Sequence, residues 1–186
     1  MKKTTLIVCM CLFGVTLTAA FAESKYPAPG RREVVIISKV SVDPPFNDAF
    51  YSNYKDKTFR FAISTTKSRE TQIELFTSQK GLARFNGTTL NNDLFMAKKI
   101  NIPNHRLIRM PYFECYVGNV SVFGIYLPVE SQFVVPEGVN YVYIGSFSYK
   151  LDPIRFIVKD VKISDEFDAA AAFVAEKYGA DAKLVR

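Results

Sequence analysis

Alternation of apolar and polar residues is the feature that most restricts the fold of this chain. It recurs in short runs after residue 32, and the apolar positions of residues 34–42 are all Val or Ile. Because the side chains of a β-strand point alternately to opposite faces, this period of two predicts strands with a buried face. Turn-forming sequences such as Asp43-Pro44-Pro45 and Pro136-Glu137-Gly138 separate the runs. The sequence therefore predicts a mostly β protein.

One segment near the C-terminus has helical periodicity instead. Ser164 is its predicted N-cap, acidic residues at 165, 166 and 168 suit the positive start of a helix, and Gly179 suits its end. A helix this short is marginal alone in water, so we expect it to pack on the sheets. The residues expected on its buried face are Phe167, Ala171, Val174 and Tyr178.

The predicted fold is an antiparallel β-sandwich or a small barrel, with one C-terminal amphipathic α-helix packed on it. An immunoglobulin-like sandwich would usually carry a Cys…Trp…Cys core, whereas this chain has no Trp. Cys115 is its one Cys after residue 22. A prealbumin-like or otherwise atypical sandwich is therefore favoured. We assign residues 33–186 to a single β-rich domain, preceded by an extended leader at 23–32.

Residues 1–22 have the pattern of a cleaved bacterial signal peptide. Lys2 and Lys3 precede an apolar stretch at 6–17, and Ala20-Phe21-Ala22 is a small-x-small cleavage site. The apolar stretch is shorter than the ~20 residues of a membrane-spanning helix. We expect cleavage before Glu23, export to the periplasm, the cell surface or the medium, and no transmembrane span in the mature chain.

Charge and cysteine content narrow the classes of partner. The 24 basic residues outnumber the 18 acidic ones only mildly, and they are scattered along strand-like segments. Most should be solvated, and nothing concentrates them as a nucleic-acid interface would. Cys115 alternates with Phe113 and Val117, which favours a buried thiol over pairing between chains. Neither the partner nor the oligomeric state follows from these residues.

Candidate catalytic and metal-binding residues are few. His105 is the single histidine, it follows Pro103-Asn104 in a predicted turn, and no known nucleophile or phosphate-binding motif is present. His105, Met110 and Cys115 supply too few ligands for a copper or structural zinc site. We therefore predict no catalytic residues, no metal and no cofactor.

Aromatic residues form the one candidate ligand site. Tyr141, Tyr143 and Tyr149 occupy alternate positions of one predicted strand, and Phe50 and Tyr54 lie on a long connection. The alternative, which we favour, is that these rings pack in the core and over a loop. The expected function is contact by an envelope, surface or binding protein. A carrier of a small apolar ligand or carbohydrate is the alternative, and a hydrolase is less favoured.

Overall fold

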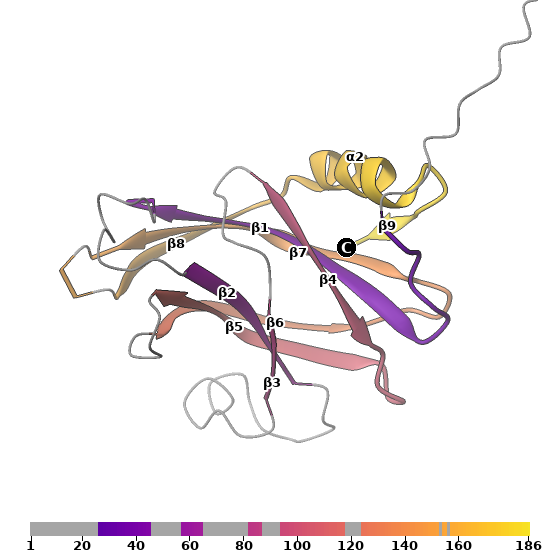
Figure 1. Cartoon of the computed structure of the whole chain (residues 1–186), viewed down its shortest axis with the longest axis horizontal. Coiled ribbons are helices and arrows are strands. Elements are labelled where there is room, and N and C mark those ends of the chain that lie inside the picture. The colour runs from indigo at the N-terminus through magenta and orange to yellow at the C-terminus, as the bar shows by residue number, and fades with distance from the viewer. Residues whose placement is uncertain are drawn as a thin grey trace, which may run out of the picture.

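Two β-sheets face each other, and a helix covers the outer face of one of them (Figure 1). This arrangement is seen in a computed structural model, which describes residues 26–45, 57–64, 82–86, 94–117, 124–152, 154–155 and 157–186. The mostly β fold with a C-terminal helix packed on it is confirmed.

Sheet A has the strand order β4-β1-β7-β8, and β9 also pairs with β7. The pairs β1–β4 and β7–β8 are antiparallel, whereas β7 runs parallel to both β1 and β9. The expected antiparallel pairing thus holds for β1–β4 and β7–β8 but not for the pairs that β7 forms with β1 and β9. The bounds of these strands are β1 Glu33–Asp43, β4 Phe95–Asn101, β7 Tyr141–Leu151, β8 Val158–Ser164 and β9 Leu184–Val185.

Sheet B has the order β3-β2-β5-β6 and is antiparallel throughout. Its central strand β5 contains Pro111 at an irregularity in the pairing with both neighbours, where a missing N–H is tolerated. The bounds are β2 Lys57–Ser64, β3 Ala83–Asn86, β5 Leu107–Val117 and β6 Gly124–Val134.

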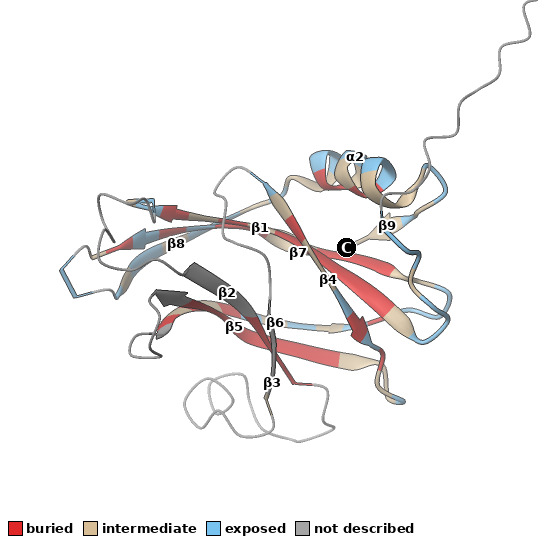
Figure 2. Cartoon of the chain, in the orientation of Figure 1, coloured by how far each residue is buried: buried red, intermediate tan, exposed pale blue. Residues whose placement is uncertain are grey.

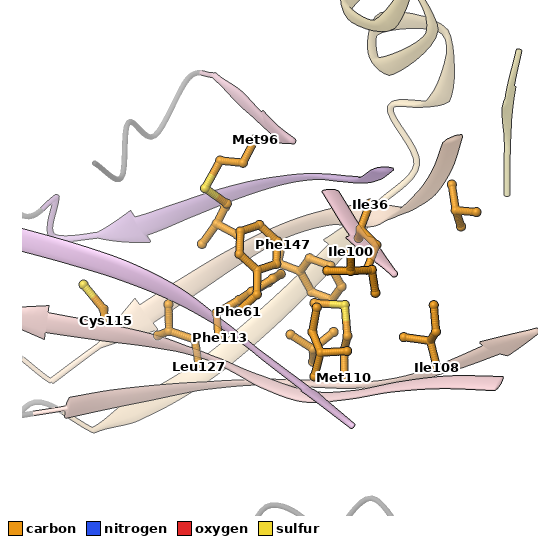
Figure 3. Close-up of a cluster of buried hydrophobic side chains, with 14 of the residues drawn as sticks. Ile36, Phe61, Met96, Ile100, Ile108, Met110, Phe113, Cys115, Leu127 and Phe147 are labelled. Atoms are coloured by element: carbon orange, nitrogen blue, oxygen red, sulfur yellow. The ribbon is translucent and has the colours of Figure 1, made fainter. Parts of the chain in front are cut away.

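The main hydrophobic core lies between the sheets. Figure 3 shows side chains from both sheets pointing toward one another, with Phe147 of sheet A among them, and Figure 2 shows long buried stretches of β1, β5 and β7. The ring of Phe113 packs edge to face against the rings of Phe61 and Phe147, with ring centroids 5.5 Å and 5.6 Å apart. These contacts join β2, β5 and β7. Cys115 is 1% exposed in this core, as its alternation with Phe113 predicted.

A second, smaller core forms between sheet A and helix α2 (Phe167–Tyr178). Ala170 and Val174 of the helix are fully buried against Val35 and Ile37 of β1. Ala170, rather than the expected Ala171, is the fully buried alanine beside Val174, and Phe167 and Tyr178 pack against this core as expected. Positions 170 and 171 both lie three or four residues from 167 and 174, so helical spacing alone does not choose between them. Sheet A is therefore covered on both faces, which explains why Val34 to Ile37 are apolar without interruption.

The start of α2 corrects the predicted cap. Ser164 ends β8, and the N-cap residue Glu166 makes no capping hydrogen bond with its own side chain. Instead, Asp165 Oδ1 accepts the N–H of Phe167 at 3.0 Å. Asp165 therefore takes the role expected of Ser164, since its carboxylate both accepts an N–H and lies at the positive end of the helix.

Candidate functional site

A bulge in β7 separates the three tyrosines of the predicted ligand site. The parallel register pairs Ile37 with Tyr143 but Lys39 with Ser146, so β7 has one extra residue between these pairs. Gly145 lies in this bulge with φ +118°, a conformation that favours glycine, and its carbonyl accepts the Ser38 hydroxyl at 2.9 Å. Because one residue is inserted, side chains after Gly145 change faces relative to those before it.

The tyrosines consequently lie in two different cores, and the expectation that they share a face is wrong. Tyr141 and Tyr143 pack under α2, while Tyr149 lies between the sheets. Their use as a ligand site stays a prediction. Phe50 and Tyr54, the other two members of the predicted site, lie outside the described residues.

Tyr149 links the two sheets through its hydroxyl. The ring is 1% exposed, and the hydroxyl donates to the carbonyl of Pro128 in β6 at 2.8 Å. Burial raises the pKa of this phenol above its usual range, so it stays protonated and able to donate. This geometry fits a structural link better than a group that binds ligand.

A polar network surrounds the start of α2. The Tyr143 hydroxyl lies 2.8 Å from Ser146 Oγ and accepts the N–H of Glu166 at 2.9 Å. Glu166 also forms an ion pair with Lys39 of β1, with Oε2 and Nζ 3.0 Å apart. At the chain end, Arg186 pairs with Asp165. Each of these polar groups is satisfied by a neighbouring protein group, so the network fastens the helix to sheet A and requires no ligand.

Two charged residues are buried on the face of β5 opposite the main core. Glu114 is 0% and Arg109 8% exposed, and Arg109 Nε donates to Gln132 Oε1 at 2.9 Å. The prediction that basic residues on strands are solvated is therefore wrong for Arg109. Alternation correctly separates Glu114 from Phe113 and Cys115, whereas Arg109 lies on the face of Glu114 because the pairing is irregular at Pro111. Alternation also does not tell a solvated face from a second buried one.

His105 has a structural role in its turn. Its Nδ1 accepts the N–H of Leu107 at 3.1 Å, and the adjacent Arg106, at φ +58°, donates from Nε to the carbonyl of Val135 at 2.6 Å. Within the described ranges, no three His, Cys, Asp or Glu side chains are grouped as metal ligands. The described helix is also not long and apolar enough to cross a membrane.

Three exposed apolar residues of the described chain, including the two most exposed, lie on the β7–β8 hairpin. Ile154 and Ile157 in its turn are 84% and 51% exposed, and Ile163 on β8 is 62% exposed. Strand β8 is at the margin of sheet A, and β7 is its one neighbour among the described strands. We name the two turn isoleucines together with strand β8 the β8 edge; its turn is exposed in Figure 2.

Known proteins give no guide to the chemistry of the β8 edge. No protein-family model matches the chain, and comparisons with curated proteins and with solved structures give no match. Its possible chemistry therefore has to be read from its own residues.

Asp152 organises the turn of the β8 edge. Its Oδ1 accepts the N–H of Ile154 at 2.9 Å and that of Arg155 at 3.0 Å, and Oδ2 lies 3.0 Å from Lys159 Nζ. The Arg155 N–H is the largest cause lowering the pKa of Asp152 to about 2, followed by Lys159. The carboxylate thus stays ionised at neutral pH and holds the backbone that bears Ile154.

Proposed function

We propose that the protein is an exported bacterial domain that acts by contact with another macromolecule, through the β8 edge. One observation carries this proposal: three of the six large apolar side chains that are exposed on the described residues belong to a single hairpin. Such residues are ordinary when scattered, whereas a group on one hairpin is typical of an interaction surface.

The backbone of the β8 edge supports the same function. A strand at the margin of a sheet presents N–H and C=O groups that can pair with a further strand. Burying a whole Ile side chain in a complex gives roughly 1.5–3 kcal/mol, so the exposed isoleucines add a substantial driving force to those hydrogen bonds. A contact protein requires no cofactor or catalytic group.

The carrier alternative has weaker support. A carrier would need space beside its aromatic residues, yet Tyr141 contacts Tyr178 of α2 with ring centroids 5.1 Å apart, and Tyr149 bonds to Pro128. For a hydrolase we find no specific observation in its favour. Export itself rests on the pattern of residues 1–22, which lie outside the described residues, and N-terminal sequencing of secreted or periplasmic protein would test it.

Site-specific photo-crosslinking in intact cells tests the contact function. A photoreactive residue in place of Ile154 should give a crosslinked product with another macromolecule. The matched control is the same residue at Ala172, which is exposed on α2 and belongs to no apolar group. Equal products at the two positions, or none at Ile154, would contradict the proposal.

A further inference from the structure

We infer that the β8 edge pairs with the β8 edge of a second copy of this chain, antiparallel and centred on Val161. This inference rests on the proposed function, because it names the partner of the same surface. A two-fold dimer requires a surface that is complementary to itself, and a strand can meet that requirement through its order of charges.

The charges of β8 are self-complementary in one register. With Val161 opposite its own counterpart, Asp160 of each copy lies opposite Lys162 of the other, so two oppositely charged pairs form. Both side chains are exposed in the monomer, and their β7 neighbours in the register are Lys150 and Ser148. Asp160 and Lys162 therefore lie outside the hydrophobic core, on the same face of the strand.

Other registers of the same strand lose this match. Centring the pair on Lys162 or on Asp160 would place like charges opposite each other, as would parallel pairing in register. A shift that centres the pair between Val161 and Lys162 would place Asp160 opposite Ile163 and Lys162 opposite Val161, so both oppositely charged pairs would be lost. In the Val161 register, Lys159 is the only charged residue of β8 that lies opposite an apolar residue, Ile163. The sequence of β8 therefore selects the Val161 register, as cross-strand pairs generally do in sheets.

The apolar face of β8 gains from the same register. Val161 and Ile163 pair with Tyr149 and Phe147 of β7, on the face that borders the main core. Ile163 is 62% exposed in the monomer, and in the dimer it lies diagonally across from Val161 of the second copy. One of the exposed isoleucines of the β8 edge is thereby covered.

The N–H of Val161, at the centre of this pairing, can exchange its present acceptor for one in the second copy. The N–H of Val161 donates to its neighbour Asp160 Oδ1 at 3.0 Å, and this acceptor is an exposed side chain. A backbone carbonyl of the second copy can replace it, which frees the carboxylate for Lys162 of that copy. Strand β4, at the opposite margin of sheet A, has Lys98 and Lys99 and no acidic residue, so it lacks this self-complementarity.

Charge reversal and restoration tests the pairing. The protein, expressed as its full chain and purified from bacteria, should show a concentration-dependent monomer–dimer equilibrium by analytical ultracentrifugation. By symmetry, Asp160→Lys or Lys162→Asp alone turns two attractive pairs into two repulsive ones and should weaken dimerisation at least about tenfold. The double variant Asp160→Lys/Lys162→Asp restores opposite charges and should dimerise as the natural chain does.

A cysteine at the symmetry axis tests the register. Val161→Cys places two thiols directly opposite each other and should give a covalent dimer with a short bifunctional thiol reagent, because facing Cβ atoms in a sheet are only about 4.5–5.5 Å apart. Lys159→Cys is the matched control, since residue 159 would lie opposite 163 and far from its own counterpart. Cys115 is 1% exposed in the main core, and Cys9 and Cys11 are present in both variants, so a difference between the two variants reports on the introduced thiol.

The outcomes separate this inference from the proposed function. A monomer at all concentrations, insensitivity to the single reversals, no rescue by the double variant, or equal crosslinking at 159 and 161 would each overturn self-pairing. If any of these occurs while the Ile154 photoproduct contains a different macromolecule, the contact function stands and only its partner is wrong. Loss of the photoproduct as well would overturn both.

Discussion

Removing the hydroxyl of Tyr143 should weaken the attachment of α2 much more than removing that of Tyr141. Both rings lie in the core between α2 and sheet A, and they are 5% and 7% exposed. The hydroxyl of Tyr143 engages Ser146 Oγ and the N–H of Glu166, whereas that of Tyr141 makes no hydrogen bond among the described residues. Replacing each Tyr by Phe therefore compares two similar changes that differ in hydrogen bonding.

The expected magnitude follows from the groups left behind. In Tyr143→Phe, the Ser146 hydroxyl, which is 3% exposed, loses a partner, and so does the Glu166 N–H at the start of the helix. A buried polar group without a partner costs about 1–3 kcal/mol, so we expect a loss of about 2 kcal/mol in the free energy of unfolding. For a domain of this size that corresponds to a decrease in Tm of about 4–8 °C.

Urea denaturation of the natural chain and the two variants measures the difference. Tyr141→Phe should change the free energy of unfolding by less than about 0.5 kcal/mol, since it removes no hydrogen bond between described residues. If Tyr143→Phe and Tyr141→Phe proved equally stable, the polar network would not fasten α2 to sheet A. A difference in m-value would instead indicate a change in how much surface unfolding exposes.

Four further outcomes are expected. Val174→Ala should cost about 2 kcal/mol in a denaturation curve, because it removes two methyl groups from a fully buried site; an unchanged midpoint would mean that α2 is not docked. Gly145→Ala should cost about 1–3 kcal/mol through its positive φ, and a neutral result would show that the bulge relaxes. The pKa of Asp152 lies below its ordinary value, so its contribution to stability is present above that value and is lost as the pH falls through about 4 to 2. The free energy of unfolding of Asp152→Asn should therefore vary less over that range than that of the natural chain, and equal slopes would argue against this role. A thiol reagent should label Cys115 far more slowly in native protein than in denaturant.

Periodicity predicted the layers of this fold but not the direction of every side chain. The strand that became β7 was expected from its alternation, and so was the burial of Cys115 on β5. The change of face at Gly145 was not, because a bulge depends on how two strands pair and the sequence of one strand does not report its neighbour. The tyrosine site was predicted on one face for this reason.

The sequence also did not predict that two charged residues are buried. Arg109 and Glu114 alternate with core residues just as solvated residues of a half-buried strand would. Whether the second face of a sheet is covered depends on segments far along the chain, which a local pattern cannot specify. The β8 edge was missed because its isoleucines look like ordinary strand residues. The opposite charges on the two sides of Val161, which make the strand complementary to itself, are a signal that could have been found.

The parallel pairing at the centre of sheet A determines the order in which the molecule can fold. Strand β1 meets β7 only across a long stretch of chain, as the hydrogen bond from Ser38 to Gly145, 107 residues apart, illustrates. Closing so long a loop is entropically costly and slow, so sheet A assembles late, after the C-terminal half of the chain is present. Until then the apolar residues of β1 have no β7 to pair with. Sheet A therefore stays open, with the apolar residues of β1 uncovered on one edge, until the C-terminal half of the chain has been synthesised.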